Sequence, residues 1–94
     1  MVVLRPAARA DIEGIWDYTL ERWGLDQAIR YDDALRAAVE GLGTGETRSQ
    51  AAGDIRPGLR RARVGSHVVI FRETEETVEV VRVLHQRMDA GRWV

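Results

Sequence analysis

Three short stretches within residues 54–94 have the polar and apolar pattern of β-strands. Leu59–Val64 alternates around its arginines, which predicts a strand with one polar face. Gly65-Ser66 is a two-residue turn signal, and His67–Arg72 after it is apolar on both faces, as in an inner strand. After a polar turn, Val78–Leu84 has the same apolar character, so it is predicted to be a third antiparallel strand.

The first half of the chain has the spacing of two amphipathic helices. Apolar residues recur at intervals of three and four over Ala8–Trp23, with charged residues between them, which predicts the first helix. Gly24 is free to take the positive φ that ends a helix, and Asp26 is expected to cap the next helix. The second helix is predicted over about Gln27–Leu42. The glycines expected to end it are Gly41, Gly43 and Gly45.

The order of elements predicts the fold class. Val2–Arg5 is a candidate edge strand, and Pro6 suits the first turn of the helix that follows. Residues 43–54 are predicted to be a loop, with room for a brief helical turn. The order strand, helix, helix and three antiparallel strands predicts an α+β fold in one domain over residues 1–94. The antiparallel helical hairpin is expected to pack on one face of the sheet.

The composition excludes several classes of protein. Cysteine is absent, which excludes disulfides, zinc–thiolate sites and cysteine nucleophiles. No apolar run approaches the ~20 residues that cross a membrane, and the amino terminus lacks the pattern of a signal peptide, so a cytoplasmic protein is expected. The histidines and carboxylates lack the spacing of metal ligands, and no glycine-rich phosphate loop is present. No metal and no cofactor are therefore predicted.

The net charge of −1 is unevenly distributed. Residues 1–46 hold five arginines against nine acidic residues, whereas residues 47–94 hold nine arginines against six. An acidic helical half therefore meets an arginine-rich sheet half, with local sums of −4 and +3. All basic residues are arginine, and a planar guanidinium suits the fork of a carboxylate or a phosphate.

Four segments in this order resemble the ParE branch of the RelE/ParE superfamily of bacterial type II toxins. They are RPAARADIEGIWDYTLERWG at 5–24, the helix at 28–42, DIRPGLRRARVGSHVVIFR at 54–72 and VVRVLHQRMDAGRW at 80–93. The most specific part is Leu84–Asp89. The resemblance implies a RelE/ParE-like fold and a growth-arresting toxin that inhibits DNA gyrase without doing chemistry itself. It also implies a ParD-like antitoxin, through which alone the complex contacts DNA and represses its operon.

The same superfamily leaves an enzymatic alternative open. RelE-like members cut mRNA on the ribosome, which requires a base, an acid and cations around the phosphate. His85, Arg63 and Arg82 are the candidates for these roles. Lysine is absent, no tyrosine lies near the carboxyl terminus, and the net charge is negative, all of which argue against a ribosome-binding nuclease. A hydrogen-bonded structural role for His85 and a non-toxic relic or corepressor are further alternatives.

A helical hairpin on a small sheet leaves apolar side chains for a partner. The stripe of Ile29, Ala34 and Val39 has no obvious internal partner, so an antitoxin helix is expected to lie along it. The arginine strand is expected to anchor acidic groups of the same partner. The predicted antitoxin contacts are Trp16, Leu20, Ile29, Leu35, Val39, Leu42, Arg60 and Arg61.

The carboxyl-terminal block Gln86–Val94 is the candidate gyrase-binding segment. It is expected to be exposed and mobile, and an exposed tryptophan is a frequent centre of binding energy. The predicted gyrase contacts are Arg87, Met88, Arg92 and Trp93. The alternative is that this tail only docks on the sheet. Trp16 and Trp23, by contrast, are most simply expected to lie in the core between the helices and the sheet, although Trp16 is also a predicted antitoxin contact.

Overall fold

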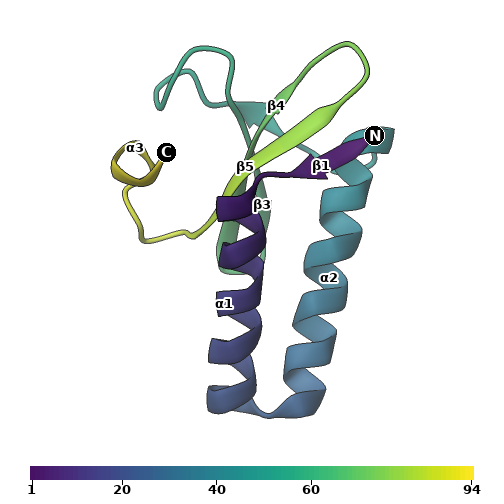
Figure 1. The fold of residues 1–94 in the computed structure, drawn as a ribbon, viewed down its shortest axis with the longest axis vertical. Helices are drawn as coiled ribbons and strands as arrows, with labels where there is room; N and C mark the ends of the chain where they lie inside the picture. The colour runs from purple at the N-terminus through teal and green to yellow at the C-terminus, as the bar shows by residue number, and fades with distance from the viewer.

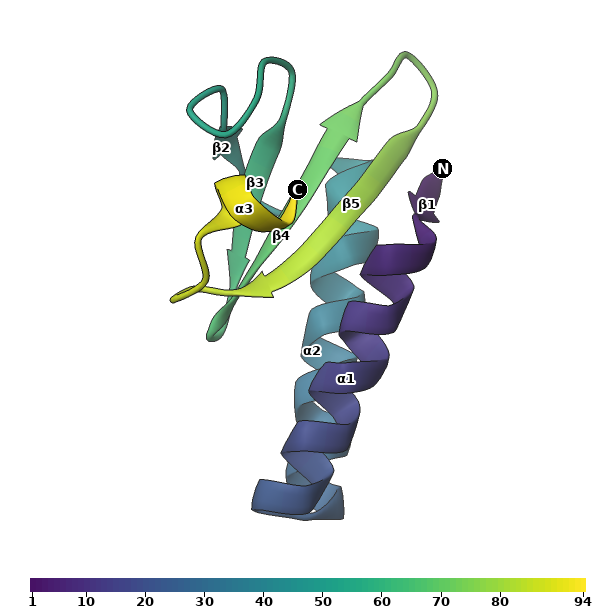
Figure 2. The ribbon, with the colours of Figure 1, turned by 60° about the vertical axis from the view of Figure 1, so that its left-hand side comes forward.

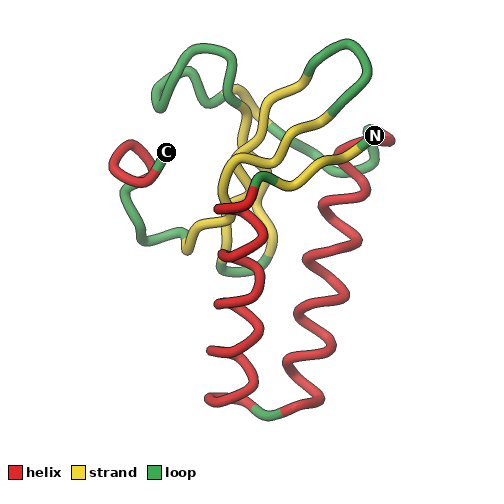
Figure 3. Tube along the Cα trace, viewed as in Figure 1, coloured by secondary structure: helices red, strands yellow, loops and turns green.

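The computed structural model describes residues 1–94 and contains three helices and five strands (Figures 1 and 3). In chain order they are β1 (Val2–Leu4), α1 (Pro6–Trp23), α2 (Leu25–Thr44), β2 (Gln50–Ala51), β3 (Arg60–Val64), β4 (His67–Glu73), β5 (Val78–His85) and α3 (Ala90–Trp93). This order confirms the predicted α+β class, with a strand and a helical hairpin before three antiparallel strands.

The strands form one sheet in the order β1-β5-β4-β3-β2. β1 lies at one edge, parallel to β5, and the remaining pairs are antiparallel. The predicted amino-terminal edge strand is therefore confirmed. β2 was not predicted, because two residues are too few to show a period of two. It lies within residues 43–54, which were expected to be a loop, and it pairs with Arg60 and Arg61.

The sheet separates two apolar clusters of different size. On its helix face, α1 and α2 pack against β3, β4 and β5, with Leu35, Phe71 and Val80 at most 1% exposed. On the opposite face, called the outer face below, a smaller cluster surrounds Ile70 and Leu84. Figure 2 shows α3 on this outer face, across the sheet from the helical hairpin.

The connection between the two helices is a single glycine. Gly24 has φ +90, as predicted, and its carbonyl accepts the Ala28 N–H at 3.1 Å. α2 therefore begins at Leu25, and Asp26 lies in its first turn instead of capping it, so that prediction is wrong. Carboxylates in the first turn still face the positive end of the helix dipole. At the other end α2 runs through two of the predicted glycine stops and ends at Gly45.

An ion pair joins the helical layer to the sheet. Both carboxylate oxygens of Asp11 on α1 accept hydrogen bonds of 2.7 Å from the Arg82 guanidinium on β5. Asp11 also accepts the Val83 N–H at 2.9 Å, and Arg82 donates to the Trp93 carbonyl at 2.8 Å. The hydrogen bonds that Arg82 donates to Asp11 raise the pKa of Arg82 above its ordinary value, against the smaller effect of burial.

A second polar cluster holds the turn between β3 and β4 against α2. The Tyr31 hydroxyl lies 2.5 Å from His67 Nδ1 and accepts the Ser66 N–H at 3.1 Å. A Cβ on Gly65 would lie 2.8 Å from the Tyr31 ring, so only glycine leaves room for this contact. His67 and His85 are paired across the strands, with ring centroids 5.4 Å apart. The two histidines, which are 18 positions apart in the sequence, are therefore neighbours in the fold.

Burial lowers the pKa of His67 below its ordinary value of 6.5, and the neighbouring His85 lowers it further. The unfolded chain then binds more protons than the folded chain between the folded pKa and 6.5. The stability that His67 contributes in its neutral form is complete above pH 6.5 and is lost as the pH falls through that window.

We expect the free energy of unfolding to fall between about pH 6.5 and pH 5.5, and to fall less in His67→Asn. Asparagine keeps a hydrogen-bond acceptor near the Nδ1 position but does not titrate. Chemical denaturation at a series of pH values measures both slopes. This pH range lies above the range in which most carboxylates titrate, so carboxylates contribute little to the measured slopes. Equal slopes in the two proteins would exclude His67 as the source.

Candidate partner-binding surfaces

The helical hairpin extends beyond the sheet, so its far end has no second layer to pack against (Figures 1 and 2). Between residues 13 and 34 only Thr19 and Ala28 are buried. The large side chains of this segment are half-buried or exposed. We call the apolar residues here that are exposed, together with the half-buried Trp16 beside them on α1, the hairpin surface: Trp16, Leu20, Trp23, Leu25 and Ile29.

The hairpin surface differs in part from the predicted antitoxin contacts. Leu20 and Ile29 are 39% and 43% exposed, and Trp16 is half-buried beside a hollow of about 430 Å³. Trp23 is 66% exposed, so its predicted place in the core is wrong. The reason is its position, because Trp23 ends α1 at the tip of the hairpin, where no sheet lies beneath it.

Three of the predicted antitoxin contacts belong to the core instead. Leu35, Val39 and Leu42 are 0%, 7% and 8% exposed and pack with the strands of the helix face. The helical period places them on the same side of α2 as Ala28, and that side faces the sheet. Val39 therefore has the internal partner that the sequence did not reveal, and none of the three offers a surface to another protein.

The two arginines assigned to the antitoxin surface point to opposite faces of the sheet. In β3, Arg61 pairs with Ile70 and shares its outer face, whereas Arg60 pairs with Phe71 on the helix face. Arg60 donates to the Ser49 hydroxyl at 3.1 Å and lies 3.7 Å from Glu73. The predicted antitoxin contacts Arg60 and Arg61 therefore lie on two different faces of the sheet.

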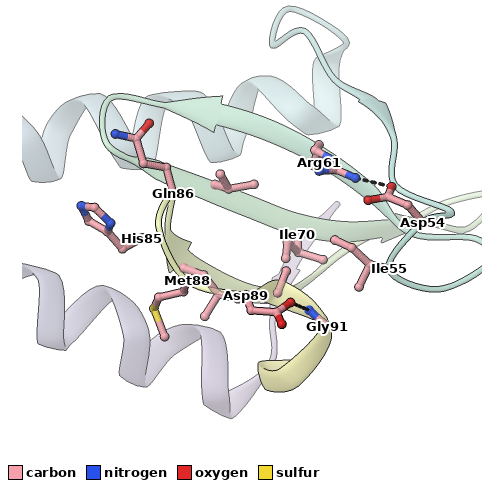
Figure 4. Close-up of a pocket in the computed structure, with 12 residues that line it drawn as sticks. Asp54, Ile55, Arg61, Ile70, His85, Gln86, Met88, Asp89 and Gly91 are labelled. Carbon is pink, nitrogen blue, oxygen red and sulfur yellow. Dashed lines mark hydrogen bonds and ion pairs between the residues drawn. The ribbon is translucent and has the colours of Figure 1, made fainter.

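The outer face carries two hollows that share Arg61. Figure 4 shows the first, of about 300 Å³, between the strands and the tail, where Arg61 pairs with Asp54. The hydrogen bond from Arg61 lowers the pKa of the Asp54 carboxyl. The second hollow, of about 610 Å³, is lined by Gln50, Arg61, Arg63, Val68, Gln86 and Arg87.

The carboxyl-terminal tail is docked on the outer face, which was the alternative to a mobile tail. Arg56 donates to the Val94 carbonyl at 2.6 Å, and Ala90 and Val94 pack against the outer cluster. The main chain of α3 is therefore held while its larger side chains remain outside. All four predicted gyrase contacts are exposed: Arg87, Met88, Arg92 and Trp93, with Trp93 52% exposed.

The candidate nuclease residues do not form one constellation. Arg82 is engaged by Asp11 and Trp93. His85 accepts the Arg87 N–H at Nδ1 and lies with its partner His67 on the helix face, while Arg63 projects from the outer face toward Gln86. No base, acid and cation therefore converge on one point among these three residues.

No three histidine, cysteine or carboxylate side chains come together in an arrangement that could hold a metal ion. None of the helices has the length and apolar character needed to span a bilayer.

Comparison with known sequences identifies the family. A family described as ParE toxin of type II toxin-antitoxin system, parDE, matches residues 2–90. Toxin ParE1 of Mycobacterium tuberculosis is 47% identical over 91 residues, covering 96% of this chain and 93% of the relative. Toxin ParE of Escherichia coli is 36% identical over 88 residues, covering 93% and 85%.

Solved structures show the same fold at low sequence identity. A chain of the chromosomal ParDE system from P. aeruginosa superposes with a TM-score of 0.74 at 17% identity, covering 89% of this chain and 92% of that one. A chain of the RelBE2 toxin–antitoxin complex from Mycobacterium tuberculosis gives 0.61 at 20% identity, covering 92% and 96%. The family match and the sequence relatives show that the chain belongs to the ParE toxins of type II toxin–antitoxin systems, within the RelE/ParE superfamily.

Proposed function

We propose that this toxin arrests growth by inhibiting DNA gyrase through direct binding and is neutralised by a ParD-like antitoxin that lies on the hairpin surface. The match to the ParE family over residues 2–90 carries this proposal. With the antitoxin bound, the toxin takes part in repression of its own operon, and the antitoxin supplies the contact with DNA. The expected place of action is the cytoplasm, where gyrase works.

The hairpin surface supports the antitoxin part of the proposal. Leu20 and Ile29 are exposed on neighbouring helices, and Trp16 on α1 borders a hollow whose lining also includes Asp32 and Arg36 of α2. An amphipathic helix laid along this surface would bury apolar side chains that the toxin alone leaves in water. From there the antitoxin would continue toward the arginine strand, where Arg60 and Arg61 offer separate contacts on the two faces.

Replacing Leu20 and Ile29 together by alanine is expected to weaken antitoxin binding by at least about tenfold, or ~1.4 kcal/mol. Both side chains are exposed, so the free energy of unfolding should change by less than about 0.5 kcal/mol. Titration calorimetry with the antitoxin encoded beside the toxin measures the affinity. Val3→Ala is the matched control, because Val3 is equally exposed on β1, outside the hairpin surface. Unchanged affinity in the double variant would remove the hairpin surface from the interface.

The exposed side chains of the tail support the gyrase part. Trp93 and Arg92 project from α3, and Arg87 and Met88 lie on the turn before it. An exposed tryptophan flanked by arginines is the composition found at the centre of protein interfaces. A non-enzymatic mechanism fits the scattered positions of His85, Arg63 and Arg82, which leave no assembled site for phosphodiester cleavage.

Purified toxin free of antitoxin is expected to convert supercoiled DNA into gyrase-cleaved linear DNA and to leave ribosome-bound mRNA intact. Trp93→Ala should reduce the cleaved DNA by about tenfold or more. It keeps the main-chain carbonyl that Arg82 binds, whereas deletion of the tail would remove this acceptor. Tyr18→Ala, which removes an exposed aromatic ring from α1, is the matched control.

Each other outcome of these assays has a defined meaning. Cut mRNA with normal gyrase activity would replace the gyrase proposal by a RelE-like nuclease. Neither effect, from toxin with an intact circular dichroism spectrum, would favour a non-toxic corepressor. Linear DNA formed equally well by Trp93→Ala would leave gyrase as the target but would place its binding surface elsewhere.

A further inference from the structure

A fourth hollow, of about 390 Å³, lies between α1 and the end of β5. Its walls are mostly apolar and include Ile15, Val83 and Met88, while its polar lining includes both histidines of the chain. A hollow of this size with a few polar groups among apolar walls has the character of a small-molecule site.

Gly14 on α1 keeps one wall of this hollow open. Glycine is, after proline, the least favourable residue in the interior of a helix. A Cβ at this position would have no other atom within 4 Å, so no close contact inside the toxin requires a glycine. The missing side chain leaves free space beside the hollow, which Gly14 lines.

The hydrogen-bond network assigns the protons of the two histidine rings. His85 accepts the Arg87 N–H at Nδ1, at 3.1 Å, so its neutral ring carries the proton on Nε2. The Tyr31 hydroxyl accepts a main-chain N–H at 3.1 Å, and its own proton has His67 Nδ1 at 2.5 Å and the Val64 carbonyl at 3.2 Å. The nearer acceptor is Nδ1, which leaves the His67 proton on Nε2 as well. Neither Nε2 atom is buried or has a partner in the toxin.

The charges around the two rings favour an anion as the ligand. The ring centroids lie 5.4 Å apart, and burial and the neighbouring His85 lower the pKa of His67. Asp11 is the one carboxylate in the lining, and its charge is already compensated by the two hydrogen bonds from Arg82. A second carboxylate beside the rings would favour the charged form of His67. The other titratable groups that face the pair are uncharged phenols, one from each long helix: Tyr18 and Tyr31.

We propose that this hollow binds a small carboxylate whose apolar stem is about the size of one aromatic ring. The carboxylate accepts hydrogen bonds from Nε2 of His67 and of His85, and the stem lies against the apolar walls. The inference goes beyond the proposed function and does not depend on it. Inorganic phosphate offers similar oxygens without a stem, so it is the less suitable ligand.

Titration of the full toxin with benzoate, followed by nuclear magnetic resonance of the histidine ring protons, tests the proposal. We expect saturable shifts of the His67 and His85 signals below about 10 mM, and binding of benzyl alcohol at least about tenfold weaker. Bound carboxylate raises the pKa of His67, so the affinity should increase by up to about tenfold per unit as the pH falls from about 7.5 to about 6. Equal binding of benzyl alcohol or of inorganic phosphate would overturn the proposal, as would the absence of saturable shifts.

Two variants locate the ligand. Gly14→Leu fills the hollow with a better helix former and should weaken benzoate binding by at least about tenfold. Ala37→Leu, which adds the same side chain to an exposed position of α2, is the matched control. His85→Asn keeps an acceptor for the Arg87 N–H but lacks the Nε2 donor, so it should also bind more weakly. Wild-type affinity in both Gly14→Leu and His85→Asn would overturn the proposal, and the predictions for the antitoxin and gyrase would stand unchanged.

Discussion

The bidentate contact between Asp11 and Arg82 is the interaction on which the arrangement of layers depends. It is shielded, with side chains only 14% and 20% exposed, so its attraction is less weakened by water than that of a surface pair. It also reaches three separate parts of the fold. Asp11 ties α1 to the main chain of β5 at Val83, and Arg82 ties β5 to the carbonyl of Trp93 in α3. The helix face and the outer face are thereby held by one pair of side chains.

An irregularity in β5 makes this contact possible. The register with β4 shifts between Ile70 and Phe71, because Ile70 pairs with Arg82 and Phe71 with Val80. Val81 is the extra residue of a β-bulge, a feature that re-aims the side chains around it. Val81 packs in the outer cluster while Arg82 beside it reaches Asp11. The surfaces proposed for the antitoxin and for gyrase are those whose side chains have no partner within the toxin after the ion pair and the bulge have fixed the layers.

The sequence predicts what is repetitive in the fold and misses what depends on tertiary position. The period of α2 identified a helix, but whether Ile29 or Val39 remains exposed depends on how far the hairpin extends beyond the sheet. Trp23 was assigned to the core because it is apolar and continues the helical period of α1, and its place at the tip overrides that pattern. The pattern identified β3 as a strand. Successive side chains of a strand project from opposite faces of the sheet, so the same pattern, applied to Arg60 and Arg61, would have placed them on different faces. The pairing of His67 with His85 depends on a register that no local pattern shows.

The most direct test is to break the Asp11 contact and examine the parts that it joins. In Asp11→Ala, hydrogen exchange measured by mass spectrometry should become faster over residues 90–94 and at the end of β5. The free energy of unfolding should fall by about 2–4 kcal/mol, because Arg82 loses its partner while partly buried. Arg36→Ala, which breaks the exposed pair with Asp32, should cost only about 0.3–0.5 kcal/mol. A loss in Asp11→Ala no larger than in this control, with unchanged exchange in the tail, would contradict the central place given to this ion pair.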